Sequence, residues 1–381
     1  MDTASLKKEI IAYSKTIGID KIGFASPSTF EEMKVRLYRQ QELRYQSGFE
    51  EKDIEKRTEP SLIFDKPKSI ISIALAYPSK MGPKVISKKG ERRGIFSRAS
   101  WGTDYHTVLR DRLKKLEEYI ALKMPEARFK SMVDTGELVD RAVAERAGIG
   151  WSGKNCSIIT PEFGSYVYLG EMITNIPFEP DHPMEDRCGS CNKCVDVCPT
   201  GALVQGGQLN AQKCIAFVTQ TKGFLAEEFR EKLGNRLYGC DTCQTVCPEN
   251  KGKDFHFHTE MEPNPEIAKP LLKPLLSISN REFKEKFGHV SGSWRGKKPI
   301  QRNAIIALAH YRDETAIPEL ITVMKDDPRP VLRGTAAWAL GKIGGQDALE
   351  ALQHAFSVEK DEEVLQEIRK GLYFFAEKKQ G

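Results

Sequence analysis

The chain has 381 residues, with 58 lysines and arginines against 53 aspartates and glutamates, and a net charge of +5 at pH 7. This length exceeds that of a usual single domain, and we expect three domains. The small net charge does not by itself indicate nucleic-acid binding. No run is apolar for long enough to span a bilayer, and the charged opening MDTASLKKEI excludes a secretory signal, so we expect a soluble, cytoplasmic protein. The pair Arg92 and Arg93 lies too far inside the chain for an export signal and is predicted to be surface charge.

The first predicted domain, residues 1–178, mixes helices with short strands. Two apolar runs predict strands at 69–78 (SIISIALAYP) and 165–174 (SYVYLGEMIT). Between them, residues 104–124 predict a core-facing helix, because apolar side chains recur on one face. Those side chains are Val108, Leu109, Leu113, Leu116 and Ile120. The mixture predicts an α/β or α+β domain.

Loops that follow strands often carry chemistry, and one such loop contains Asp134. A strand-like run ends at Val133, and a helix is expected from about Val139 until Gly148 ends it. The spacing leaves two roles open for Asp134. It is either catalytic, or it caps the helix, because Glu137 three residues later completes a capping box.

The stretch GWSGKN, residues 150–155, follows this helix and combines glycines, hydrogen-bond donors and one cation. Such a loop suits a polar or anionic ligand. It is not a nucleotide-binding P-loop, because the pattern G-x-x-x-x-G-K-[ST] is not satisfied. The next residue, Cys156, has no histidine near it in the sequence, and we expect a buried small side chain rather than a nucleophile.

The second predicted domain, residues 179–260, holds all the other cysteines in two runs. The first run has the spacing C-x2-C-x2-C-x3-C and ends before Pro199, and the second ends before Pro248. In two-cluster ferredoxins, three cysteines of one run hold one cube, and the cysteine before the proline ligates the other cube. The first 4Fe-4S cluster is therefore assigned Cys188, Cys191, Cys194 and Cys247. The second is assigned Cys198, Cys214, Cys240 and Cys243.

Structural zinc is the alternative, since zinc sites also use C-x2-C pairs. Three closely spaced cysteines and a repeated C-x3-C-P step favour iron–sulfur clusters, and paired cubes usually conduct single electrons. A redox protein is therefore predicted. The 25 residues between Cys214 and Cys240 leave room for a helix and a loop that face a partner or a cofactor.

The third predicted domain, residues 261–381, begins with a connector, because prolines at 263, 265, 270 and 274 exclude one continuous helix. The sequence then repeats at an offset of about 31 to 33 residues. The repeating segments are PIQRNAIIALAHYRDETAIPELITVM, PVLRGTAAWALGKIGGQDALEALQHAF and the degenerate EVLQEIRKGLYFF. Paired helices at this period predict a short solenoid of HEAT-like repeats, and an ordinary helical bundle is the alternative.

The order of the motifs resembles the epoxyqueuosine reductase family over essentially the whole chain. The blocks are VDTGELVDRAVAERAGIGWSGKN, then CGSCNKCVDVCPTGA and YGCDTCQTVCP, then the repeats. The resemblance implies an oxidoreductase that reduces epoxyqueuosine at the wobble position of tRNA to queuosine, the last step of queuosine biosynthesis. It implies two 4Fe-4S clusters that pass electrons to base-off cobalamin. The implied fold is multidomain α+β, with a cobalamin-binding domain at 1–178 similar to nitroreductases and reductive dehalogenases.

The resemblance also implies roles for individual residues. Asp134 matches the family's proton donor, and its pKa is expected to be raised by burial over the corrin. The side chains expected at the cobalamin are Arg57, Ser97, Arg141, Ser152, Lys154, Asn155, Cys156, Ser157, Ser165 and Asp241; ordinary surface polarity is the alternative. The cobalamin signature D-x-H-x-x-G is absent, because residues 104–109 read DYHTVL, so His106 is not expected to bind cobalt.

A tRNA substrate requires cations directed at phosphates, and the stretch SGSWRGKKPIQRN supplies them. The candidate RNA contacts are Lys222, Trp294, Arg295, Lys297, Lys298, Arg302 and Arg333. A solvated helix end is the alternative, since Asp326 and Asp327 lie in the same region of the chain.

The expected partners are the anticodon stem-loop of a tRNA carrying epoxyqueuosine and an external low-potential electron donor. We expect a monomer that does not bind a membrane. The rival interpretations are an electron-transfer module and an adaptor with structural clusters, and both leave the Asp134 loop without a use. A reductive dehalogenase is the nearest enzymatic rival, but a respiratory one would carry an export signal.

Overall fold

The computed structural model describes residues 2–82 and 84–378 and divides into two compact units. The first unit comprises the chain up to Lys80, Gly102–Cys214 and Asp241–Glu262, and the second comprises Met81–Trp101, Ile215–Cys240 and the chain from Pro263. Each unit is made of three separate segments of the chain, so the two units do not correspond to the three consecutive domains predicted from the sequence. The three-domain division therefore stays a prediction. No helix in the described part of the chain is long and apolar enough to cross a membrane.

The first unit is built on a four-stranded antiparallel sheet with the strand order β1-β2-β7-β4. The strands are β1 (Lys21–Ala25), β2 (Ser69–Ala76), β7 (Val167–Thr174) and β4 (Phe129–Met132). The central strand β2 is buried along its whole length, as its continuous apolar run predicts. Both strands expected from the sequence are therefore confirmed.

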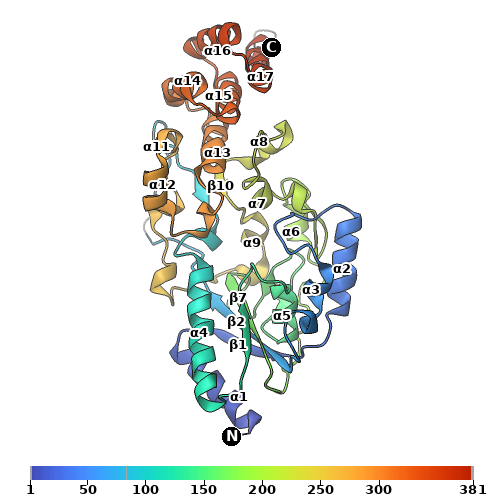
Figure 1. The fold of residues 1–381 in the computed structure, drawn as a ribbon. Helices are drawn as coiled ribbons and strands as arrows, with labels where there is room; N and C mark the ends of the chain where they lie inside the picture. The colour runs from blue at the N-terminus through green and yellow to red at the C-terminus, as the bar shows by residue number, and fades with distance from the viewer. Residues whose placement is uncertain (1, 83, 379–381) are drawn as a thin grey trace. The chain divides into compact units, whose positions relative to one another are not determined.

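Helices cover both faces of this sheet (Figure 1). On one face, α4 (Tyr105–Lys123) packs beside α1 (Thr3–Thr16) and buries the five apolar side chains that its sequence predicts. On the other face, α5 (Asp140–Arg146) buries Ala142 and Val143 in a cluster that also contains Ile70 and Ile173. These two layers make the mixed helix and sheet fold that the sequence indicates.

Short elements complete the first unit. Near the sheet lie α2 (Glu31–Glu42), α3 (Ile54–Thr58) and the hairpin of β5 (Trp151–Ser152) and β6 (Ile158–Ile159). The cysteine-rich part holds α6 (Lys193–Asp196), α9 (Thr242–Thr245) and the hairpin of β8 (Leu203–Gln205) and β9 (Gln208–Leu209).

The second unit contains the helical repeats. Two helix pairs are followed by one more helix: α13 (Lys297–His310), α14 (Ile317–Asp326), α15 (Pro330–Ile343), α16 (Gln346–Val358) and α17 (Glu362–Lys378). This matches two full repeats and a degenerate third. The proline-rich connector forms α10 (Pro265–Ala268) and α11 (Leu272–Ser277) before α12 (Asn280–Phe287), so its prolines do prevent one long helix, as predicted.

The segment between Cys214 and Cys240 belongs to this second unit. It forms α7 (Ile215–Val218), α8 (Glu227–Leu233) and β10 (Arg236–Tyr238), and β10 pairs in parallel with β3 (Ile95–Phe96). The segment therefore contains the helix and loop for which its length leaves room, and its elements α8 and β10 pack on α13.

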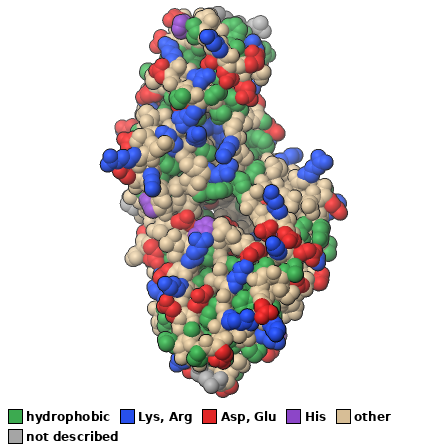
Figure 2. All heavy atoms as spheres, viewed as in Figure 1, with side chains coloured by type: hydrophobic (Ala, Val, Ile, Leu, Met, Phe, Trp, Pro, Cys, Tyr) green, Lys and Arg blue, Asp and Glu red, His purple; other side chains and the backbone are tan. Residues whose placement is uncertain are grey.

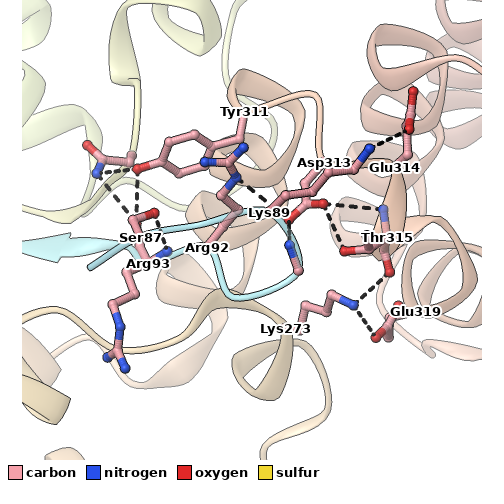
Figure 3. Close-up of polar contacts among 12 residues, drawn as sticks. Ser87, Lys89, Arg92, Arg93, Lys273, Tyr311, Asp313, Glu314, Thr315 and Glu319 are labelled. Atoms are coloured by element: carbon pink, nitrogen blue, oxygen red, sulfur yellow. Dashed lines mark hydrogen bonds and ion pairs between the residues drawn. The ribbon is translucent and has the colours of Figure 1, made fainter. Parts of the chain in front are cut away.

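The segment 87–93 is fixed to the first repeat by ion pairs and hydrogen bonds (Figure 3). Asp313, only 1% exposed, accepts the backbone N–H of Gly90 at 3.2 Å and lies 3.8 Å from Arg92 Nε. Arg93 pairs with Glu266 at 2.9 Å. The arginine side chains are 24% and 15% exposed. Their interpretation as surface charge is therefore wrong, because Arg92 lies against Asp313 of the first repeat and Arg93 pairs with the connector helix α10.

Helices α15 and α17 cross where two glycines meet, since a Cβ on Gly341 would lie 2.4 Å from the Cα of Gly371. We expect Gly341→Val to destabilise the second unit by about 1–3 kcal/mol, because overpacking forces the helices apart. Calorimetry of the full chain measures the lower unfolding temperature. Gly82→Val is the control, since nothing lies within 4 Å of its Cβ position. Equal unfolding temperatures for the two variants would contradict this close crossing.

Candidate iron–sulfur centre and active site

The cysteines assigned to the first cluster line one cavity of about 60 Å³ in the first unit. Cys188, Cys191 and Cys194 come from the first run, and Cys247 comes from the second. The runs meet because the short helices α6 and α9 pack against each other. The cysteine before the second proline thus reaches the first run, which is the exchange that the two-cluster spacing predicts.

Cations surround this cavity. Lys154, Arg187 and Lys193 line it, against one acidic side chain, Glu249. Lys154 Nζ also donates to the carbonyl oxygen of Gly189 at 2.7 Å, which ties the GWSGKN stretch to the cysteine loop. Positive charge beside four thiolates suits an anionic iron–sulfur cube.

The cysteines assigned to the second cluster are distributed over both units. Cys198, Cys214 and Cys243 belong to the first unit, and Cys240 ends a segment of the second. Cys198 Sγ accepts the backbone N–H of Ala202 at 3.2 Å, a bond that stabilises a thiolate. None of the nine cysteines forms a disulfide, and all are half-buried. The assignment of the second set stays a prediction.

Asp134 lies in the loop after β4, with its side chain 61% exposed and a positive φ of 53°. Its backbone N–H donates to Asp140 Oδ2 at 2.9 Å. The N-cap of α5 is Val139, and Glu137 pairs with Lys130 at 2.6 Å. The capping-box alternative for Asp134 is therefore wrong. Its left-handed backbone belongs to the strained conformations that gather at functional sites.

His106 bridges Asp134 and Asp104. Its Nδ1 lies 2.7 Å from Asp104 Oδ1, and its Nε2 lies 3.4 Å from Asp134 Oδ2. Burial lowers the pKa of His106, but the two carboxylates outweigh it and raise the pKa to about 9. In return, the ion pair with His106 holds the pKa of Asp134 below its usual range. The groups of the protein thus lower the pKa of Asp134, and the rise expected from burial over the corrin stays a prediction. In this arrangement the imidazole carries the proton at neutral pH.

The sequence did not indicate that His106 and its neighbour Tyr105 belong to this site. Tyr105 contributes a further hydrogen bond that lowers the pKa of Asp134, and its ring stacks on Tyr168 at 4.7 Å. Asp104 caps α4 by accepting the backbone N–H of His106 at 3.0 Å. In the sequence, Asp104 indicates only the start of a helix. A helix start does not indicate that His106 lies next to Asp134.

Two further carboxyl groups lie beneath the Asp134 loop. Burial and the charge of Asp134 raise the pKa of Asp140 to about 6. Glu171 on β7 is 0% exposed, and burial raises its pKa well above the ordinary value. Glu171 keeps its proton at neutral pH, and Asp140 accepts the backbone N–H of Asp134 at 2.9 Å. The loop is thus held from below by the Asp140 carboxylate.

Three family models match separate stretches of the chain. Residues 57–135 match the model described as epoxyqueuosine reductase QueG, DUF1730; residues 187–250 match a 4Fe-4S double cluster binding domain; and residues 296–372 match HEAT repeats. The second match favours iron–sulfur over zinc, and the third favours repeats over an ordinary bundle.

Curated relatives match over the full length. The epoxyqueuosine reductase of Bacillus anthracis is 73% identical over 380 residues, which is 100% of both chains, and that of Escherichia coli is 30% identical over 90% of both chains. This chain belongs to the epoxyqueuosine reductase family.

Solved epoxyqueuosine reductases have the same fold. One crystal structure with an epoxyqueuosine-modified tRNA-Tyr stem loop is 68% identical, covers 98% of this chain and 100% of its own, and superposes with a TM-score of 0.97. A Bacillus subtilis structure of the same identity and coverage, with a TM-score of 0.96, is described as having the Asp134 catalytic loop swung out of the active site.

Among the side chains singled out by the resemblance to epoxyqueuosine reductases, Arg57, Arg141 and Cys156 gather in one place. Burial and the nearby charge of Arg141 lower the pKa of Arg57. Arg141 Nη1 donates to the carbonyl oxygen of Cys156 at 2.7 Å. Burial raises the pKa of the Cys156 thiol, which agrees with a packing role rather than a nucleophile. Two neighbouring guanidinium groups suit an anionic group such as a phosphate.

The serines have partners within the protein. Ser152 Oγ donates to Glu145 at 2.9 Å, the Ser157 N–H donates to Asn155 Oδ1 at 3.1 Å, and the buried Ser165 bonds with Asn250 at 2.7 and 2.9 Å. Asp241 immediately precedes α9, and Ser97 lies in the second unit, where its N–H donates to Tyr238. Cofactor contacts by these residues stay predictions.

One of the proposed RNA contacts is wrong. Arg302 is 1% exposed, and its guanidinium donates to the carbonyl oxygens of Val218, Thr221 and Gly223 at 2.8 to 3.2 Å, so it is not available to a phosphate. Arg333 is paired with Glu359 through two contacts of 2.8 and 3.1 Å. An RNA contact by Arg333 stays a prediction.

Two of the remaining candidate RNA contacts, Trp294 and Arg295, contact the loop of residues 219–224. Trp294 is 52% exposed and donates its indole N–H to the Gln220 side chain at 2.8 Å, and Arg295 Nε lies 3.3 Å from the Gln220 carbonyl oxygen. Lys222 and Lys298 are exposed. Lys297 is half-buried and donates to the Ile278 carbonyl oxygen at 2.6 Å. Figure 2 shows Lys and Arg side chains gathered over the region of α13.

The coupling of His106 to Asp134 predicts a titration. We expect Asp134→Asn to lower the pKa of His106 from about 9 towards 6.5, because one of the two carboxylates that stabilise the imidazolium is lost. In the native chain, the stabilisation from the protonated imidazole is full below pH 6.5 and is lost as the pH rises through about 9. The pKa of His106 in the native chain and in the Asp134→Asn variant is measured from the pH dependence of its ring signals in NMR. Asp254→Asn, beside His256 at 3.3 Å, is the control and should leave His106 unchanged.

Proposed function

We propose that this protein reduces epoxyqueuosine at the wobble position of tRNA to queuosine, as the last step of queuosine biosynthesis. The proposal depends above all on one observation: a full-length member of the family combines a four-cysteine cavity with an exposed carboxylate bound to a protonated histidine in the same unit. The description of the Bacillus subtilis relative supports a catalytic Asp134 loop, and the tRNA-Tyr stem-loop structure supports the substrate.

The residues present fit both cofactors. The cavity supplies four thiolates, cations and buried N–H donors for an iron–sulfur cube. Arg57 and Arg141 suit the phosphate of cobalamin, and residues 1–178 form the proposed cobalamin domain, with a fold similar to nitroreductases and reductive dehalogenases. When bound, cobalamin reduced through the clusters supplies the two electrons that opening an epoxide requires.

The side chains of this protein supply the proton that the epoxide oxygen needs when the ring opens. An opened epoxide leaves an alkoxide that recloses unless it is protonated. His106 holds a proton at neutral pH and lies 3.4 Å from Asp134, which is exposed and presents its carboxyl group to solvent. Forming the alkene consumes two electrons and two protons and releases the epoxide oxygen as water. Asp134 relays the first proton from His106 to the oxygen, and the second proton comes from solvent. General acid catalysis of this kind contributes roughly 100-fold to 10,000-fold in rate.

The tRNA is bound by the second unit through Lys222, Trp294, Arg295 and Lys298. Their side chains provide cations for phosphates and an exposed indole on which a base can stack. We propose that the anticodon stem-loop is the part recognised. The protein would act as a cytoplasmic monomer and receive single electrons from an external low-potential donor.

The role of Asp134 is tested by single turnover. Anaerobic, cofactor-loaded protein is mixed with tRNA carrying epoxyqueuosine and a low-potential reductant, and queuosine is measured by nucleoside mass spectrometry. We expect Asp134→Asn to lower the rate at least about 100-fold with cobalamin still bound. Glu137→Gln, in the same loop but paired with Lys130, should retain the native rate. Equal rates for Asp134→Asn and the native chain would assign the proton to another group.

The RNA surface is tested by salt-dependent binding. We expect Trp294→Ala to weaken stem-loop binding by about 1–3 kcal/mol through lost stacking, and Lys222→Ala to reduce the slope of log affinity against log salt by about 1. Filter binding or anisotropy at several salt concentrations measures both. Lys360→Ala, an exposed cation after α16, is the control. An unchanged affinity and slope in both variants would place the tRNA elsewhere.

A further inference from the structure

Two buried side chains of the GWSGKN stretch carry hydrogen-bond donors without an acceptor among the described residues. Trp151 is 0% exposed and Asn155 is 6% exposed, and neither the indole Nε1 nor the amide Nδ2 has a hydrogen-bond partner. A buried donor left unsatisfied costs about 1–3 kcal/mol. Two such donors within five residues indicate a missing acceptor.

The Trp151 side chain lies beside residues that line the cysteine cavity. The guanidinium of Arg187, which lines the cavity and directly precedes Cys188, lies 5.5 Å from the centre of the Trp151 ring. The backbone of Trp151 pairs with Ile159, another residue that lines the cavity, in the β5–β6 hairpin.

The Asn155 donor faces the same cavity. Asn155 lines the cavity beside Cys188 and Cys194. Its Oδ1 accepts the backbone N–H of Ser157 at 3.1 Å, which fixes the amide and leaves Nδ2 as the atom without an acceptor. The neighbouring Gly153 permits this fit, since a Cβ there would lie 2.8 Å from Asn155 Oδ1.

We propose that Trp151 Nε1 and Asn155 Nδ2 donate N–H···S hydrogen bonds to the first 4Fe-4S cluster and its Cys188 ligand, and that these bonds raise its reduction potential. The inference rests on the iron–sulfur part of the proposed function. It assigns the amide of Asn155 to the cluster instead of to cobalamin. Both residues act as positioning and tuning groups for the cluster and do not touch the substrate.

The physical basis is charge. Reduction adds one electron, received from the external low-potential donor, and increases the negative charge on the cluster sulfurs. N–H donors stabilise that added charge and therefore favour the reduced form. Because Trp151 and Asn155 are buried, water does not replace their hydrogen bonds when either side chain is removed.

The experiment is a redox titration of the full-length, cluster-loaded protein followed by EPR, without tRNA. We expect Trp151→Phe and Asn155→Leu each to shift one of the two cluster potentials to more negative values. A tenfold lower ratio of reduced to oxidised cluster at a fixed potential corresponds to a shift of about 59 mV for one electron. Trp338→Phe is the matched control, since that indole is 3% exposed and donates to Glu227.

Unchanged potentials in both variants at native iron and sulfide content would overturn the proposal. Loss of cobalamin from Asn155→Leu with an unchanged cluster potential would place the amide at the cobalamin and overturn its assignment here. If Trp151→Phe fails to assemble its cluster, the native chain with ¹⁵N-labelled indole tests the hydrogen bond instead. Pulsed EPR should then detect coupling between the indole ¹⁵N and the reduced cluster. Absence of this coupling would contradict the hydrogen bond from Trp151. A native protein that gives cluster signals but no queuosine would refute the proposed function alone.

Discussion

The hydrogen bonds among Ser165, Gln244 and Asn250 join the cysteine-rich part of the first unit to its sheet. Asn250 Oδ1 accepts the Ser165 N–H at 2.7 Å, Asn250 Nδ2 donates to Ser165 Oγ at 2.9 Å, and Gln244 Nε2 donates to the Ser165 carbonyl oxygen at 2.9 Å. Gly164 permits this contact, since a Cβ there would lie 2.1 Å from Asn250 Oδ1. Ser165 precedes β7, and Asn250 follows Cys247 by three residues. The cluster ligand that crosses between the runs is thereby anchored to the strand that carries Glu171.

Features with a strong sequence period could be predicted. The apolar run of β2, the one-sided helix α4 and the repeats each carry a pattern that one local structure satisfies. The exchange of Cys247 followed from spacing as well. The membership of 81–101 and 215–240 in the second unit could not be predicted, because it depends on contacts such as Asp313 with Gly90 between residues more than 200 positions apart.

The candidate site was predictable only in part for the same reason. Asp134 could be predicted as a site residue because it follows a strand. Its partner His106 lies in the first turn of another element, α4, and the local sequence there indicates only the start of a helix. Basic residues near the repeats were found by composition. Composition does not distinguish Lys298, which is exposed, from Arg302, which is one helical turn further along α13 and faces the core. Tertiary packing determines whether a cation is exposed to solvent, as Lys298 is, or buried against carbonyl oxygens, as Arg302 is.

Electron and proton supply require opposite electrostatics, and the first unit keeps them apart. Cations and N–H donors surround the cysteine cavity and favour added negative charge. Around Asp134, carboxylates hold a proton on His106, while the buried Glu171 keeps its own proton and so avoids a second buried charge near Asp140. If Glu171 were ionised, its charge would raise the pKa of Asp140 further and weaken the acceptor that holds the Asp134 backbone N–H. The buried proton on Glu171 therefore serves the geometry of the loop, and the proposed acid step would use the proton on His106.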